Sequence, residues 1–224
     1  MISMTAEKKS VKNRLWLFLL LVFVGGFLGG FTHEYRGGVF ANAQTGNLIN
    51  FGVALSTGNV SKALHCLCSF IAYTTGAFTC QRAMDRCRKS GRRWECILLT
   101  FELAMLVFLA LLPSGAPFLI TQVGINLMAS MQYHTFKGVA GVNMATTFVT
   151  NHTRNLGVAL EKTVFEHDPD QRRRIPMHLA SLGTFILGVC CAAVTGRALD
   201  GYALLICLPP VAVNLAAYLR ERES

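Results

Sequence analysis

The chain has 224 residues, 52% of them hydrophobic and 15% charged, with a formal net charge of +9. Soluble domains carry about 25% charged residues, so this composition excludes an ordinary soluble domain and indicates a polytopic membrane protein. In a soluble protein the positive balance would suggest a nucleic-acid partner. Here basic cytoplasmic loops explain it, and no nucleic-acid partner is expected.

Six apolar runs are long enough to cross a hydrocarbon core, which needs about 20 helical residues. They cover residues 15–33, 63–81, 94–112, 116–136, 177–197 and 200–219. The first run follows a basic tail but holds the glycine-rich stretch GGFLGG, lacks a clear cleavage site and precedes many further spans. It is therefore a predicted membrane span rather than a secretory signal. Its small residues are expected to permit close helix packing.

Two segments between these runs are rich in Gly, Asn, Gln and Thr. They cover residues 37–57 and 138–160, and part of the first is echoed in the second at a constant offset of 105. Residues 45–55 read TGNLINFGVAL and residues 150–160 read TNHTRNLGVAL, with six of eleven positions identical. Because the surrounding apolar runs recur too, we interpret the echo as an internal repeat.

The basic residues decide how the two polar segments are expected to run. They gather in residues 1–14, in the 82–93 and 161–176 loops and at Arg220 and Arg222. Cytoplasmic loops are enriched in Lys and Arg. If both polar segments crossed the membrane, the 82–93 loop would lie outside. If both are re-entrant, all four basic clusters are cytoplasmic.

We therefore expect an all-α membrane protein of about six transmembrane helices and two re-entrant broken-helix segments, with both termini cytoplasmic. The predicted repeats, residues 15–112 and 116–219, are related by inversion and flanked by cytoplasmic tails, residues 1–14 and 220–224. Inverted repeats with broken helices are a transport architecture, and re-entrant backbone must be buried in protein or line a wet cavity. The alternative is seven or eight full spans.

The polar segments also supply the predicted solute ligands, because polar groups in an apolar setting need partners. A half-helix starting near Asn47 would turn its N-terminal amides toward a polar or anionic ligand. The predicted substrate-binding residues are Asn42, Gln44, Thr45, Gly46, Asn47, Asn143, Thr146, Thr147, Thr150, His152 and Arg154. The alternative is that these side chains only cap broken helices and join neighbouring ones.

Two charged residues stand out because charges inside a membrane segment are costly. Arg154 would favour an anionic solute, or it snorkels to the cytoplasmic face. Glu102 is predicted to carry a proton or to balance Arg154, with a purely structural partner as the alternative.

Two polar groupings lie outside the repeated segments. Gln122 and Asn126 fall near one face of their helix, so this helix is expected to line the cavity. His33, Glu34 and Arg36 are interpreted as a surface ion cluster.

The eight cysteines show no CxxC pairing and no metal-ligand spacing, so neither a disulfide framework nor a metal site is predicted. No Walker, Rossmann, HExxH or GxSxG motif occurs, and no nucleophile has an obvious base. The sequence therefore predicts neither a cofactor nor an enzyme.

The stretches GGVFANAQTGNLINFG at 37–52 and NMATTFVTNHTRNLG at 143–157 resemble the YoaK-like family of bacterial membrane proteins, which have a domain of unknown function. The second stretch departs from the family pattern, since Thr150-Asn151-His152 stands where Thr-Gly-Asn is often repeated. The resemblance covers nearly the whole chain and implies a multi-pass protein of the bacterial inner membrane.

The function expected from these observations is a transporter or channel for a small polar or anionic solute, with the lipid bilayer and the solute as partners. A homo-oligomer is compatible with it. The alternative function is a non-transporting scaffold or sensor subunit. Costly polar backbone at mid-membrane depth favours transport, because a scaffold does not need it.

Overall fold

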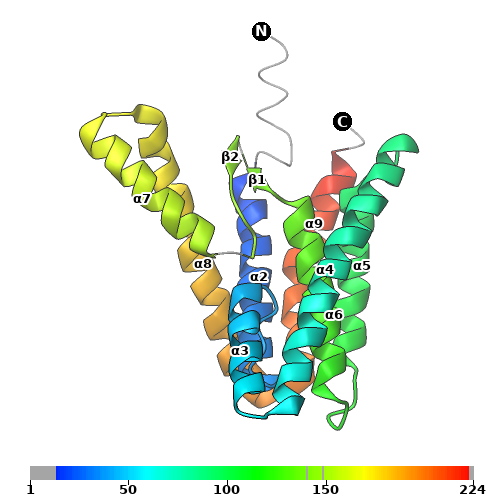
Figure 1. The fold of residues 1–224 in the computed structure, drawn as a ribbon. Coiled ribbons are helices and arrows are strands. Elements are labelled where there is room, and N and C mark those ends of the chain that lie inside the picture. Colours follow the sequence, from blue (N-terminus) through cyan, green and yellow to red (C-terminus); the bar gives the residue numbers. More distant parts are fainter. Residues whose placement is uncertain (1–13, 140, 148, 222–224) are drawn as a thin grey trace.

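A computed structural model of the chain describes residues 14–139, 141–147 and 149–221 (Figure 1). Of the basic tail, Lys8, Lys9 and Lys12 lie outside the described residues. The helices are α2 (Leu15–Tyr35), α3 (Gln44–Ser56), α4 (Val60–Lys89), α5 (Trp94–Ala110), α6 (Phe118–Thr135), α7 (Val149–Phe165), α8 (Pro169–Leu199), the 3-10 helix η2 (Asp200–Cys207) and α9 (Leu208–Arg220). One antiparallel hairpin, β1 (Gly138–Val139) with β2 (Val142–Asn143), precedes α7. The predicted all-α fold is confirmed.

Within the described part of the chain, three helical stretches are long and apolar enough to cross a membrane: Leu15–Tyr35, Val60–Lys89 and the continuous stretch Pro169–Arg220. The last of these comprises α8, η2 and α9. Length and composition are thus consistent with a membrane protein.

The connection between α7 and α8 is shorter than the loop predicted at residues 161–176. The side chain of Asp168 accepts hydrogen bonds from the backbone nitrogens of Asp170 (2.8 Å) and Gln171 (3.2 Å), so it caps α8 at its N-terminus. Pro169 suits the first helical position because its missing N–H has no intrahelical partner there. These capping residues begin the helix early, and most of the predicted loop is helical.

The last predicted helix, residues 200–219, is divided. Residues 200–207 form η2 and the α-helical geometry begins only at Leu208. Pro209 and Pro210 lack the N–H groups that would bond to the carbonyls four residues earlier. The tighter 3-10 winding accommodates that loss at the junction.

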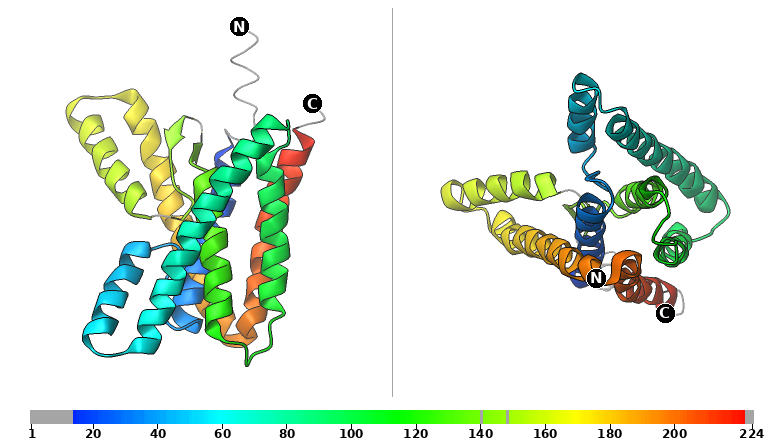
Figure 2. Two further views of the ribbon diagram at one scale, coloured as in Figure 1. Left: turned by 45° about the vertical axis from the view of Figure 1, so that its right-hand side comes forward. Right: turned by 90° about the horizontal axis from the view of Figure 1, so that it is seen from below.

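The long helices run between two ends of one bundle. The α4–α5 connection, the α7–α8 connection and the end of α9 lie at the same end, and Figure 2 shows this from a second side. We call it the basic end because it carries Arg88, Arg92 and Arg173. The α3–α4 and α5–α6 connections and η2 lie at the opposite end (Figure 1).

The helices α3 and α7 each occupy only half of the bundle's length. Starting midway, α3 runs to the end opposite the basic end, and α7, also starting midway, runs to the basic end (Figures 1 and 2). The most extensive packing is α2 on α8, α4 on α6, α7 on α8 and α3 on α4. Each half-length helix therefore lies against one long helix that follows it in the chain.

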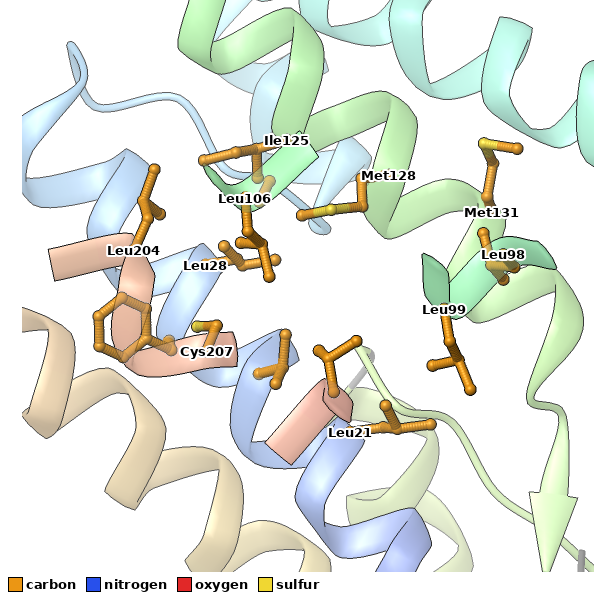
Figure 3. Packing of buried hydrophobic residues seen from close by; sticks show 14 of the residues in the cluster. Leu21, Leu28, Leu98, Leu99, Leu106, Ile125, Met128, Met131, Leu204 and Cys207 are labelled. Carbon is orange, nitrogen blue, oxygen red and sulfur yellow. The ribbon is translucent and has the colours of Figure 1, made fainter. Parts of the chain in front are cut away.

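An apolar core fills the space between α2, α5, α6, η2 and α9. Leu21, Leu28, Leu99, Leu106, Ile125, Met128 and Cys207 belong to it, and Figure 3 shows these side chains converging from α2, α5, α6 and η2. Burial of such side chains contributes about 1.5–3 kcal/mol each. Among the described residues, this core joins the first helix, α2, to the last, α9.

Glycines set the closest helix crossings. A Cβ at Gly188 of α8 would lie 2.3 Å from the carbonyl oxygen of Phe23 in α2. A Cβ at Gly76 of α4 would lie 2.6 Å from the carbonyl oxygen of Leu127 in α6. Both of the largest helix interfaces thus depend on a missing side chain.

We expect Gly188→Ala to lower the stability of the detergent-solubilised protein by about 1–3 kcal/mol, because the α2 backbone must move away from the new methyl group. Thermal unfolding followed by circular dichroism measures the change. Gly157→Ala in α7 is the matched control, since nothing lies within 4 Å of its Cβ position. Equal melting temperatures for Gly188→Ala and the parent would contradict the tight crossing.

Candidate functional site

The chain breaks between α2 and α3 with two successive glycines. Gly37 and Gly38 have φ angles of +74° and +67°, a backbone region that side chains disfavour. The ammonium group of Lys62 in α4 donates to the carbonyl oxygens of both glycines, at 3.0 Å for Gly38. The turn is thus held against the start of α4.

The buried side chain of Asn47 fixes this first break. Its Oδ1 accepts from the backbone nitrogen of Phe40 (2.8 Å), and its Nδ2 donates to the carbonyl oxygen of Phe40 (2.8 Å) and to Gln44 Oε1 (3.2 Å). The amide therefore substitutes for a strand partner to Phe40. Both of its donor hydrogens are used within the break.

The second break is held in a similar way, although one ring nitrogen satisfies only one of the two backbone groups. His152 and Ala145 stand at the offset of 105 from Asn47 and Phe40. Nε2 of His152 lies 2.8 Å from the carbonyl oxygen of Ala145 and 3.4 Å from its backbone nitrogen. A buried side chain in the first turn of each half-length helix thus holds the backbone seven residues before it.

Both breaks meet on one face of α2. Nδ2 of Asn42 donates to the carbonyl oxygen of Gly25 (3.1 Å). A Cβ at Gly25 would lie 2.4 Å from the carbonyl oxygen of Thr146, and one at Gly29 would lie 3.2 Å from Asn42 Oδ1. The two chain breaks can approach α2 together because this face has no side chains.

The other two glycines of the stretch face α8. A Cβ at Gly26 would lie 2.2 Å from the carbonyl oxygen of Phe185, and one at Gly30 would lie 3.1 Å from Val189. The stretch GGFLGG therefore serves two contacts, with Gly25 and Gly29 toward the breaks and Gly26 and Gly30 toward α8. The predicted close packing is confirmed.

A cavity of about 320 Å³ lies between the two breaks, and we call it the inter-break cavity. It is lined by Gly29, Gly30, His33, Phe40, Asn42, Ala43, Thr147, Val149, Thr150, Phe185 and Val189. These residues come from α2, from both breaks, from the start of α7 and from α8. The cavity therefore joins the two halves of the chain.

The cavity offers polar groups that lack internal partners. The hydroxyl of Thr147 is buried, lines the cavity and forms no hydrogen bond with any described residue. Ala43 caps α3 without a side-chain hydrogen bond, and Val149 begins α7 at the same cavity. The N-termini of both helices thus open here, where their partial positive charge favours a polar or anionic ligand.

The structure brings some of the predicted ligands to this cavity. Asn42, Thr147 and Thr150 line it. Thr146, which is next to Thr147, is fully buried with an unpartnered hydroxyl. Their role as solute ligands stays a prediction.

Other predicted ligands of the first polar segment do not line the cavity. Gly46 lies against the ring of Phe40, because a Cβ at Gly46 would be 2.9 Å from the ring carbons. Gln44 donates to Asn126 Oδ1 (2.8 Å), Thr45 is exposed, and Asn47 is occupied by Phe40 as described. The alternative interpretation, that such side chains cap breaks and join neighbouring helices, describes Gln44 and Asn47.

In the second polar segment, three predicted ligands also lie away from the cavity lining. Asn143 is exposed in β2, and His152 is bonded to Ala145. Arg154 is exposed on α7 and forms no ion pair within the part of the chain that the structure describes. Among the described residues, therefore, no arginine lines the cavity.

Glu102 lies on the far side of α2 from the cavity, in the apolar core. It is 1% exposed, and neither carboxyl oxygen has a hydrogen-bond partner among the described residues. The predicted charge balance with Arg154 is not found, because Arg154 is exposed on α7 whereas Glu102 is buried on α5.

The polar face of α6 also differs from its prediction. Gln122 and Asn126 do not line the cavity. Instead, Gln122 Oε1 lies 2.6 Å from Nδ1 of His65, and Asn126 accepts from Gln44. This face joins α6 to the first break and to α4.

Two histidines near the site were not among the ligands predicted from the sequence, and Arg36 was wrongly assigned to the surface. His33 lines the cavity and stacks on Phe40 with ring centroids 4.8 Å apart. His178 of α8 contacts His152, which only the folded chain reveals. Arg36 is not part of a surface cluster, since it is buried and pairs with Asp200 at 2.8 Å.

We expect Asn47→Ala to destabilise the protein by about 2–4 kcal/mol, because the backbone N–H and C=O of Phe40 lose their partners. Chemical or thermal unfolding of the purified protein measures the difference. Thr45→Ala, two residues away and exposed, should change stability by less than about 0.5 kcal/mol. A stable Asn47→Ala protein would show that the amide is dispensable to the break.

A sequence model of DUF1275, described as a protein of unknown function, matches residues 17–218 of the chain. No curated relative and no solved structure matches it.

Proposed function

Because the chain belongs to the DUF1275 family, whose function is unknown, its activity must be inferred from the site, and we propose that it is an integral membrane transporter or channel for a small polar or anionic solute. The observation that carries this proposal is the inter-break cavity. The N-termini of two half-length helices open into it beside the unpartnered hydroxyl of Thr147. A broken backbone at mid-membrane depth must be buried in protein or line a water-filled cavity, and this cavity supplies the second condition.

In the proposed topology, α2, α4, α5, α6, α8 and the η2–α9 unit cross the membrane, and α3 and α7 are re-entrant. The positions of the two short helices support this assignment. With 13 residues, α3 extends about 20 Å at 1.5 Å per residue, which is less than a hydrocarbon core of about 30 Å. Both α3 and α7 start midway along the bundle, whereas α5, with as many residues as α7, runs between its two ends (Figure 1). Seven or eight full spans are therefore less favourable.

The pattern of helix packing supports two repeats. The two repeats make α2 equivalent to α6, α3 to α7, α4 to α8 and α5 to α9. Under this equivalence the α2–α8 interface corresponds to the α6–α4 interface, and the α3–α4 interface corresponds to the α7–α8 interface. The same equivalence relates Gly188 to Gly76 at the closest crossings. The opposite directions of α3 and α7 favour inversion, which is the arrangement of many transporters (Figure 1).

The size and chemistry of the cavity narrow the solute class. Its volume of about 320 Å³ is at the lower end of ligand sites, which span about 300–1,000 Å³. Asn42, Thr147 and Thr150 offer hydrogen bonds, and His33 is the only ionisable side chain in the lining. We therefore propose a compact polar solute, with any anionic group held by helix N-termini rather than by Arg154.

We propose a bacterial inner-membrane location with the basic end in the cytoplasm, because cytoplasmic loops are rich in Lys and Arg. A scaffold or sensor subunit is the weaker candidate. It gives no reason for an unpartnered buried hydroxyl beside two open helix N-termini.

Cysteine labelling tests the topology. We expect Arg88→Cys and Arg173→Cys to react with an impermeant maleimide only after cells are permeabilised, and Ser114→Cys to react in intact cells. Among the native cysteines only Cys190 is exposed, so the background is low. Labelling of position 88 in intact cells would contradict the re-entrant assignment of α3 and α7.

Flux measurements test the function. The parent in proteoliposomes is expected to pass at least one of glycerol, urea, formate and inorganic phosphate faster than protein-free vesicles. Thr147→Val should slow that flux about tenfold, because it removes a hydrogen bond of about 1.4 kcal/mol while keeping the side-chain shape. Thr147→Ser should restore it.

Two variants outside the lining serve as controls for the flux. The hydroxyl of Thr153 bonds to its own helix at Val149, so Thr153→Val should match the parent. Arg154→Gln should also match it, for neutral and anionic solutes alike. A selective loss of anion flux in Arg154→Gln would show that the arginine takes part in anion binding. Unchanged flux in Thr147→Val would show that the solute does not pass through the cavity.

A further inference from the structure

Two buried histidines meet where α7 begins. His152 and His178 are 2% and 1% exposed, and their Nδ1 atoms are 3.2 Å apart. The rings are edge-to-face with centroids 5.4 Å apart. This pair joins the second break to α8.

The hydrogen positions follow from the partners. Nε2 of His152 lies 2.8 Å from the carbonyl oxygen of Ala145, so it carries the hydrogen. In a neutral ring Nδ1 is then an acceptor, and Nδ1 of His178 must donate to it. Two neutral imidazoles therefore satisfy this contact completely.

The surroundings provide no counter-charge for an additional proton. No described carboxylate forms an ion pair with either ring. The charged side chain that acts on His178 is Arg174, on the same helix. The neighbouring apolar cluster contains Phe18 and Val22 of α2, Val139 of β1, Met144 of the break and Met177 of α8.

A proton added to this pair creates a buried cation. If it binds Nδ1 of His152, two donors face each other and the contact is lost. If it leaves the hydrogen bond intact, the charge lies on His178, beside Arg174. Either outcome penalises the closed arrangement, because an unpaired buried charge is costly.

The backbone contact of the first break contains no such group, and the nearby His33 only stacks on the ring of Phe40. Asn47 stands at the equivalent position and its spare donor goes to Gln44, so that contact cannot titrate. Only the second break combines the shared backbone contact with an ionisable pair.

We propose that His152 and His178 form a proton-binding site that controls the second break, with the neutral pair holding residues 144–147 against α8 and the protonated pair releasing them. This inference deepens the proposed function and rests on it for its consequence, since the released segment carries Thr147 of the cavity wall. The proton is then the coupling ion of transport. The contact is complete at high pH and is lost as the pH falls through the imidazole range.

Hydrogen–deuterium exchange of the full chain in nanodiscs tests the site without any solute. Between pH about 7.5 and about 5.5, the range in which histidine titrates, the protection factors of residues 141–152 should fall about tenfold after correction for intrinsic exchange. Residues 40–47, the first break, should show no comparable change and are the internal control.

Variants separate the pair from general acid effects. His152→Asn copies the residue of the first break, so it should keep the Ala145 contact and remove the pH dependence. His178→Gln should independently remove the pH dependence of exchange. His134→Gln, a histidine that bonds to Gln81 instead, should retain the parental profile.

A parental profile in which residues 141–152 follow residues 40–47 would overturn the proton site, as would pH-dependent protection in both His152→Asn and His178→Gln. Because exchange needs no solute, it can fail while Thr147→Val still slows flux. Conversely, unchanged flux in Thr147→Val together with the expected exchange profile would leave the proton site standing and remove the transport assignment.

Discussion

The absence of side chains on two faces of α2 is the constraint on which the site depends. Gly25 and Gly29 admit the breaks, and Gly26 and Gly30 admit α8. Any larger residue at these positions would push a break or a helix outward, and the cavity between them would lose its wall. The helix thus separates two environments, with the apolar core of Figure 3 on one side and the inter-break cavity on the other.

The breaks are held by one device used twice. A buried side chain in the first turn of each half-length helix bonds to the backbone seven residues earlier, through Asn47 to Phe40 and through His152 to Ala145. The N-terminus of α3 has no side-chain cap, and both Ala43 and Val149, at the starts of the two helices, line the cavity. The difference between an amide and an imidazole makes the two breaks chemically unequal, although their geometry is alike.

Charges are kept away from the cavity. Arg36 pairs with Asp200 at the end opposite the basic end, and Arg93 donates to the carbonyl oxygen of Tyr218 and pairs with Glu221 at the basic end. The described lining of the cavity midway between them has backbone dipoles, the hydroxyl groups of Thr147 and Thr150, the amide of Asn42 and the imidazole of His33 instead. Such a site binds polar groups without the desolvation cost of a buried fixed charge.

The sequence by itself determined the helical class and the positions of the breaks, because composition, apolar run length and the 105-residue echo are local patterns. The echo also aligned Thr45 with Thr150 as equivalent positions in the sequence. The sequence could not predict which polar side chains face the cavity. Asn47 and Thr147 are both buried and polar, yet Asn47 bonds to Phe40 and Thr147 faces the cavity. The sequence predicted Arg154 as an anion ligand, but this side chain is exposed on α7. A short turn folds α7 against α8. Only the tertiary structure decided the contact of His152 with His178, because this contact depends on how the two helices pack.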